Sequence, residues 1–115
     1  MSTLLTPEEL SDLQLTSPKL CLIDLRSLEE VSEGIIPGAI WMDISDREFM
    51  AKAGTLSKDV EYCLYCASGG RSAMAVSFFE MQGFSEVFEL AGGASAWIES
   101  GKVLARFPSD SSIGN

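Results

Sequence analysis

The sequence of 115 residues contains no histidine. This absence excludes every mechanism in which a histidine base activates a cysteine nucleophile, as in Cys-His proteases and transferases. It also argues against zinc: structural sites need four cysteine or histidine ligands and catalytic sites usually include a histidine, whereas the chain offers three cysteines. We therefore expect neither a metal site nor a cofactor.

Basic residues are scarce as well. Eight lysines and arginines stand against 17 aspartates and glutamates, which gives a net charge of −9. Without a dense basic cluster such a chain repels a phosphate backbone, so nucleic acid is not an expected partner. The same field slows the approach of a small anion, so an anion-binding site must be made locally positive.

Long apolar runs and export signals are also missing. No apolar run approaches the roughly 18 residues of a membrane span, and the N-terminal stretch MSTLLTPEEL lacks the basic region and long apolar segment of a secretory signal. Cys21, Cys63 and Cys66 are an odd number without the spacing of a disulfide framework. We therefore expect a soluble cytoplasmic protein with reduced thiols and no membrane contact.

The composition is that of a globular protein, with 46% hydrophobic and 22% charged residues. The length fits one domain, which we assign to residues 1–107. The polar tail over residues 108–115, PSDSSIGN, is expected to be disordered.

Apolar runs of strand length alternate with helical patterns. Strands are predicted over residues 20–25, 39–42, 60–66 and 86–90, and the first is nearly continuously apolar, as in a parallel strand covered on both faces. A capping box of Thr6 and Glu9 begins a helix that runs to about Gln14. Further helices are predicted over residues 46–54, 71–83 and 94–100. This alternation predicts an α/β fold, a parallel sheet with helices on both faces that binds ligands at the carboxyl ends of its strands.

The stretch CASGGRS, from Cys66 to Ser72, joins a predicted strand to a predicted helix. Inward-facing N–H groups in such a loop form an anion-binding nest, which the positive end of the helix dipole reinforces. Gly69 and Gly70 permit the backbone conformations and close approach that a nest requires. A free cysteine pKa of about 8.5 can fall to roughly 3.5–7.5 in such surroundings, so we predict that Cys66 is a nucleophile rather than a small core residue.

Arg71 is the only cation of this loop, and its planar fork can bind two oxygens of an oxyanion. Ser68 and Ser72 can donate further hydrogen bonds. A thiolate beside an oxyanion pocket suits attack on phosphorus, on arsenic or on the outer sulfur of a thiosulfate-like donor. The local chemistry alone does not choose among these three.

Three ordered segments, LIDLRSLEEVSEGIIPGA, LYCASGGRSAMA and GFSEVFELAGGASAW, resemble the rhodanese homology domain over roughly residues 20–97. The resemblance implies a five-stranded parallel α/β fold and a sulfurtransferase in which Cys66 takes up sulfane sulfur as a persulfide. The implied partners are a small anionic sulfur donor, a thiophilic acceptor and a sulfur-relay protein. The implied anion cradle consists of Ala67, Ser68, Gly69, Gly70, Arg71 and Ser72.

Loop length separates the catalytic branches that this fold resembles. Six residues from Cys66 through Arg71 are similar to the sulfurtransferase branch, whereas the related cell-cycle phosphatases have one residue more. We therefore favour sulfur transfer over a cysteine-dependent phosphatase or arsenate reductase, and over a non-catalytic sulfur-carrier or interaction module. The chain departs from the family where Ile35 replaces a common histidine and Val31 a common aromatic residue, and we interpret Ile35 as a packing variation.

Several neighbours of the loop are expected to be structural. A strand places Cys63 on the face opposite Cys66, so Cys63 and Cys21 are predicted core residues, although a nearby Cys63 could act as a resolving thiol. Asp24 and Arg26 are predicted to orient the site without entering the chemistry, Asp24 by accepting from N–H groups of the loop next to it and Arg26 by pairing with Glu30. Trp97 and the phenylalanines are expected in the core, and the acidic pairs Glu8-Glu9 and Glu29-Glu30 on solvated helix faces or at caps.

Overall fold

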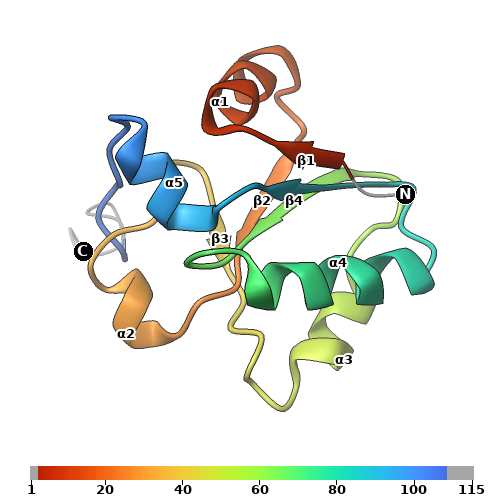
Figure 1. Cartoon of the computed structure of the whole chain (residues 1–115). Helices are drawn as coiled ribbons and strands as arrows, with labels where there is room; N and C mark the ends of the chain where they lie inside the picture. The colour runs from red at the N-terminus through yellow and green to blue at the C-terminus, as the bar shows by residue number, and fades with distance from the viewer. Residues whose placement is uncertain (1–2, 109–115) are drawn as a thin grey trace, which may run out of the picture.

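The structure, a computed structural model, describes residues 3–108 and contains one five-stranded sheet in which every strand pairing is parallel (Figure 1). The strand order is β1-β5-β4-β2-β3, so β4 lies in the middle. This confirms the predicted fold class. The strands are β1 (Thr3–Leu5), β2 (Cys21–Asp24), β3 (Ile40–Trp41), β4 (Glu61–Tyr65) and β5 (Glu86–Leu90).

Helices cover both faces of the sheet. They are α1 (Pro7–Thr16), α2 (Leu28–Val31), α3 (Phe49–Gly54), α4 (Gly70–Met81) and α5 (Gly93–Glu99). Figure 1 shows α1 and α5 on one side of the sheet and α3 and α4 on the other. Within residues 3–108, no helix has the length and apolar character needed to cross a membrane.

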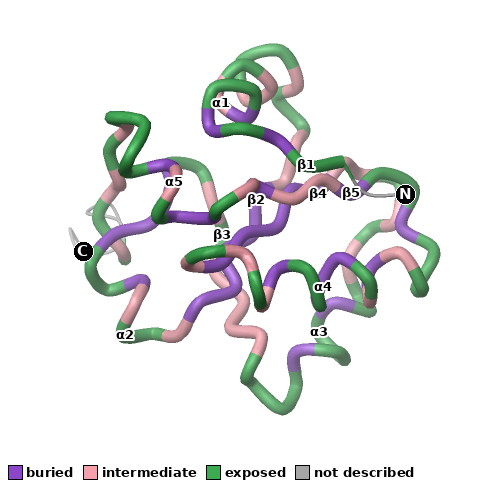
Figure 2. Tube along the Cα trace, viewed as in Figure 1, coloured by how far each residue is buried: buried purple, intermediate pink, exposed green. Residues whose placement is uncertain are grey.

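Two hydrophobic clusters fix these layers. One lies under α3 and α4 and includes Ile23, Leu64 and Phe79, whereas the other lies under α1 and α5 and includes Leu22 and Trp97. Leu22 and Ile23 are consecutive, and they enter different clusters because strand side chains alternate between faces. Fully burying a side chain such as Phe79 contributes about 1.5–3 kcal/mol. Figure 2 shows this burial concentrated along the strands and the inner sides of the helices.

The four predicted strands and four predicted helices are present, mostly with shorter bounds. The α1 capping box forms as predicted, since Thr6 Oγ1 accepts from the Glu9 N–H at 3.1 Å and the Glu9 side chain accepts from the Thr6 N–H at 2.9 Å. The helix predicted from residue 46 begins only at Phe49, because Asp46 accepts the Glu48 N–H in a turn. Met74 and Met81 follow the helical spacing of α4 but are exposed.

Two elements were not predicted from the pattern. The edge strand β1 has three residues, of which only Leu5 is buried, so it lacks a readable alternation. The helix α2 has four residues and is too short for an apolar period. Its capping box of Ser27 and Glu30 is nevertheless in the sequence, which agrees with the expected capping role of the Glu29-Glu30 pair. Of the predicted tail over residues 108–115, all but Pro108 lies outside the described residues.

Candidate active site

The Cys66–Ser72 loop lies at the carboxyl end of the central strand. Cys66 directly follows β4, Gly69 is the N-cap of α4 with φ +126°, and Gly70 is the first helical residue. The prediction that this stretch joins a strand to a helix is therefore confirmed. The positive φ explains the glycine at position 69, because other residues rarely adopt that conformation.

Cys66 Sγ points at the amino end of α4. The Gly69 N–H donates to Sγ at 3.1 Å, the Ser72 N–H donates at 3.4 Å, and Ser72 Oγ lies 3.6 Å away. Burial is the largest single influence on the thiol and opposes ionisation. The Ser72 hydroxyl and the N–H groups of Ser72, Gly69 and Ser68 outweigh it, so the pKa of Cys66 lies below its ordinary value. Cys66 is only 1% exposed, yet it belongs to neither hydrophobic cluster.

The loop is held in place by α5. The N–H groups of Ala94 and Ser95 donate to the carbonyls of Cys66 and Ala67 at 2.8 and 2.9 Å. These carbonyls therefore face α5, which leaves the loop N–H groups free to face the sulfur. Gly93 makes the approach possible: its φ is +61°, and a Cβ there would lie 2.8 Å from the Ala67 carbonyl and closer still to that of Cys66.

Arg71 pairs with Glu30 of α2. Its Nη1 and Nη2 donate to the two carboxylate oxygens at 2.8 and 2.9 Å, the parallel geometry of a bidentate pair. The hydrogen bond from Arg71, with a further one from Ser27, lowers the pKa of Glu30 to about 2. The fork that the sequence offers to an oxyanion is thus engaged by a carboxylate of the chain itself.

Asp24 and Arg26 form a buried ion pair beside the site. Arg26 Nη2 donates to Asp24 Oδ2 at 2.8 Å and to the Gly34 carbonyl at 2.7 Å, and Asp24 Oδ1 accepts the Arg26 N–H at 2.8 Å. The expectation that Asp24 accepts an N–H of the loop next to it is confirmed, since Arg26 lies in the loop that follows β2. The expected pairing of Arg26 with Glu30 is wrong, because Asp24 is nearer along the chain and Glu30 is held by Arg71. In the part of the chain that the structure describes, neither side chain hydrogen-bonds the Cys66–Ser72 loop.

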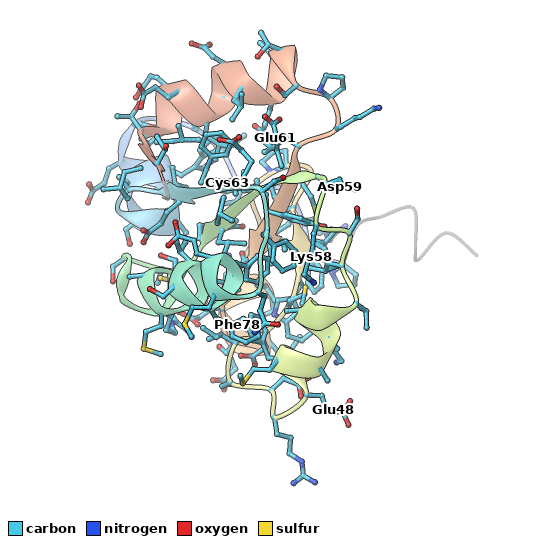
Figure 3. All side chains as sticks on the ribbon, turned by 90° about the vertical axis from the view of Figure 1, so that its right-hand side faces the viewer. Glu48, Lys58, Asp59, Glu61, Cys63 and Phe78 are labelled. Carbon is cyan, nitrogen blue, oxygen red and sulfur yellow. The ribbon has the colours of Figure 1, made fainter. Side chains whose placement is uncertain are left out.

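Cys63 lies in the hydrophobic cluster under α1 and α5, as predicted for a core residue. Figure 3 shows it at the level of the sheet, with Phe78 on the other side between α4 and α3. Burial, with a smaller effect of the Glu89 charge, raises the pKa of Cys63 to about 12, which is unfavourable for a resolving thiol. Cys21 is half-buried against the other cluster, and burial raises its pKa as well.

The two positions that depart from the family are both packed inside. Ile35 is buried and pairs its backbone with Ala105, in agreement with a packing variation. Val31 is completely buried. The N–H of Ile36, which follows Ile35, donates to Tyr65 Oη at 3.0 Å, so this segment is joined to the last residue of β4.

Three residues that the sequence did not assign to the site contact it directly in the structure. Glu30 holds Arg71, Gly93 admits the loop, and Glu89 Oε2 accepts the Ser72 hydroxyl at 2.7 Å. The capping box of α2 and the Gly92-Gly93 pair were visible signals, but neither pointed to the loop. Among residues 3–108, no group of three or more histidine, cysteine, aspartate or glutamate side chains is arranged to hold a metal ion.

The sequence model of the Rhodanese-like domain matches residues 6–100. The chain belongs to the rhodanese-like domain family. Among its rhodanese-like relatives is a protein from Allochromatium vinosum named sulfurtransferase, 31% identical over 94 residues that cover 82% of this chain and 86% of the relative. YtwF of Bacillus subtilis, named as a candidate sulfurtransferase, is 43% identical over 79 residues, or 69% and 74% of the two chains.

Comparison with solved structures leads to the same family. A crystal structure of a rhodanese-related protein from Thermoplasma volcanium superposes with a TM-score of 0.79 at 28% identity, covering 91% of this chain and 98% of that one. The five-stranded parallel sheet is therefore a rhodanese-like sheet, and the Cys66 loop lies at its carboxyl edge.

Proposed function

We propose that the protein is a rhodanese-type sulfurtransferase that moves sulfane sulfur from a small anionic donor to a thiophilic acceptor through a persulfide on Cys66. The observation that carries this proposal is the position of Cys66 Sγ, within 3.1 and 3.4 Å of two N–H donors at the start of α4. These donors favour the thiolate without a histidine base.

The first half-reaction with thiosulfate as donor is a displacement at sulfur. The Cys66 thiolate attacks the outer sulfur, a new S–S bond forms to Sγ, and the bond to the sulfonate sulfur breaks. Sulfite leaves with the bonding electron pair, and the total charge is unchanged. The outer sulfur of the persulfide then carries the negative charge beside the loop N–H groups and the positive end of α4.

The second half-reaction returns the enzyme to its starting state. A nucleophile such as cyanide or an acceptor thiolate attacks the outer sulfur, and Cys66 leaves as a thiolate. The same N–H groups that stabilise the nucleophile in the first step stabilise this leaving group. The two half-reactions together predict ping-pong kinetics.

In this proposal the anionic donor is held mainly by backbone N–H groups of the loop and less by a free positive charge. Arg71 is the loop cation, but Glu30 occupies its fork in the structure. An anionic donor that reaches Arg71 must share or displace that carboxylate, which favours a donor small enough to be held largely by N–H groups. A cysteine thiolate of a sulfur-relay protein in the cytoplasm is the acceptor that best fits this chemistry.

Mass spectrometry after exposure to thiosulfate tests the proposal. We expect a gain of one sulfur atom on the peptide that contains Cys66, lost on treatment with cyanide and absent in Cys66→Ser. Thiosulfate:cyanide sulfur transfer should be assayed beside phosphoester and arsenate turnover. Turnover of the phosphoester or of arsenate without sulfur uptake would overturn the proposal in favour of a phosphatase or an arsenate reductase. A persulfide that forms but is not passed to cyanide or to a thiol would indicate a sulfur carrier.

A further inference from the structure

The hydroxyl of Ser72 lies between Cys66 and a carboxylate. Ser72 is fully buried at the first turn of α4, with Oγ 3.6 Å from Cys66 Sγ and 2.7 Å from Glu89 Oε2. Glu89 belongs to β5 and is paired in register with Leu64 of β4, on the face of the sheet that α4 covers. The series of contacts Cys66–Ser72–Glu89 therefore connects the residue that follows β4 to α4 and to β5.

A serine hydroxyl has a single hydrogen to donate. Three acceptors surround the hydroxyl of Ser72: Glu89 Oε2 at 2.7 Å, the Gly69 carbonyl at 3.1 Å and Cys66 Sγ at 3.6 Å. Glu89 is both the nearest and a charged acceptor, and charge-assisted hydrogen bonds of this length are about twice as strong as neutral ones. The Ser72 hydroxyl therefore donates its hydrogen to Glu89 Oε2, and Ser72 Oγ accepts the hydrogen of the Cys66 thiol.

We propose that Glu89 is a positioning residue that limits ionisation of Cys66 by holding the hydroxyl hydrogen of Ser72. While Cys66 is a thiol, its S–H group donates to Ser72 Oγ and the Ser72 O–H donates to Glu89. When the thiol proton leaves to solvent, the hydroxyl must turn from Glu89 to Sγ in order to stabilise the thiolate. The rotation breaks the hydrogen bond from Ser72 to Glu89, and this loss opposes ionisation of Cys66. The negative charge of Glu89 also repels the thiolate, which is a second and weaker effect.

This inference rests on the proposed function only in taking Cys66 as the nucleophile. For a sulfurtransferase the consequence is a cysteine that holds its proton to a higher pH than it would if the Ser72 hydroxyl were free to donate to Sγ. Arg71 of α4 interacts electrostatically with Cys66 and with Asp24 of β2, and its guanidinium is held by Glu30 of α2. Cys63 of β4 interacts electrostatically with Glu89 from the opposite face of the sheet.

The test compares Glu89→Gln with Glu86→Gln. Both remove one negative charge from β5, but Glu86 is exposed at the other end of the strand, in register with Glu61. The readout is the rate of iodoacetamide alkylation at Cys66 as a function of pH, followed by the mass of its peptide so that Cys21 and Cys63 do not interfere. Circular dichroism and thermal unfolding establish that each variant is folded.

We expect Glu89→Gln to move the alkylation midpoint of Cys66 to lower pH by at least half a unit, or roughly a threefold higher thiolate fraction on the acid side. Glu86→Gln should leave the midpoint where it is in the wild type. In a Ser72→Ala background the shift caused by Glu89→Gln should fall to less than half, because the hydroxyl that links the two groups is gone.

An unchanged midpoint in Glu89→Gln, or an equal shift in Glu86→Gln, would overturn the proposal. A full shift that persists in Ser72→Ala would overturn the route through the hydroxyl. The titration needs no sulfur donor, so it gives its answer even if the protein transfers no sulfur. If sulfur transfer is observed, the acid limb of kcat/KM for thiosulfate should move with the alkylation midpoint.

Discussion

Cys63 and Cys66 are three residues apart, the first within β4 and the second directly after it, and the two thiols have opposite surroundings. Both are almost completely buried, at 0% and 1% exposure. Burial, with a smaller effect of the Glu89 charge, raises the pKa of Cys63 to about 12, whereas N–H and hydroxyl donors lower the pKa of Cys66 in spite of burial. Exposure therefore does not separate a core thiol from a nucleophile in this chain.

The alternation of the strand produces this difference. Cys63 shares a cluster with Tyr65 under α1 and α5, while Leu64 faces α4. Cys66 comes one residue after β4, at the position where the chain turns into the amino end of α4. The same side chain thus becomes a small hydrophobe on one face and the centre of a nest on the other.

Replacing each thiol in turn should have the largest effect. Cys66→Ala is expected to lower thiosulfate:cyanide sulfur transfer to the background rate and to abolish the persulfide, because no other described thiol has a lowered pKa. Cys63→Ala should keep transfer within about twofold of the wild type and lower the free energy of unfolding by about 1 kcal/mol, as for an ordinary core substitution. Loss of transfer in Cys63→Ala with an intact fold would show that Cys63 takes part in the chemistry.

Gly93→Ala should have the next largest effect. A Cβ at this position meets the carbonyls of Cys66 and Ala67, so the loop must move away from α5 and its N–H groups from the sulfur. We expect at least a tenfold loss in kcat/KM, about 1.4 kcal/mol of transition-state stabilisation. Stopped-flow or steady-state kinetics of sulfur transfer measure this loss in kcat/KM.

Gly83→Ala is the matched control for that substitution. Gly83 also has a positive φ, +88°, but no atom lies within 4 Å of a Cβ built there. Both variants should lose stability from backbone strain, about 1–2 kcal/mol, yet only Gly93→Ala should lose activity. Equal losses of activity would mean that contact between α5 and the loop does not position Cys66.

Arg71→Lys should produce a smaller effect, of several-fold in KM for thiosulfate. A lysine keeps the charge but loses the two parallel hydrogen bonds to Glu30, so both the loop cation and α2 become less well positioned. Arg47→Lys, at an exposed position, should leave KM unchanged. If Arg71→Lys leaves KM at the wild-type value, the anion-binding role predicted for Arg71 is wrong.

The smallest expected effect is the response of stability to acid. The pKa of Glu30 is lowered to about 2 in the folded chain by the hydrogen bond from Arg71, so its contribution is complete above the unfolded value near 4.5 and is lost as the pH falls toward 2. The pair is about one-third exposed, so solvent limits this contribution to about 1 kcal/mol.

Thermal unfolding of Glu30→Gln measures this contribution. The variant should be less stable than the wild type by about that amount at neutral pH, and the difference should shrink as the pH falls below about 4. A difference that is the same at neutral and acid pH would show that the loss comes from the α2 cap and not from the charge.

Much of the fold could be predicted because its signals are local. The apolar run at residues 20–25 and the Thr6-Glu9 capping box each specify one element, and alternation of strands with helices specifies a parallel sheet. The strand β1 could not be read in the same way. Its three residues are placed by pairing with β5, a partner more than 80 positions away.

The site, like the fold, could be predicted only where its residues are close together in sequence. Cys66, the two glycines and Ser72 lie in one continuous stretch, so the sequence carries their arrangement. The contacts of Glu30 with Arg71 and of Glu89 with Ser72 join residues 41 and 17 positions apart, and no local pattern records them. The mistaken partner of Arg26 has a related origin: Glu30 is held by Arg71 from α4, 41 positions away, and Arg26 pairs instead with Asp24, two positions away.

The most direct test of the central claim is the pH dependence of alkylation of Cys66 and Cys63 in a single sample of the wild-type protein, separated by peptide mass. The account predicts that Cys66 reacts with a midpoint below the ordinary thiol value of about 8.5 and that Cys63 stays unmodified while the protein is folded. A midpoint for Cys66 at or above that value would contradict the stabilisation of its thiolate by the loop.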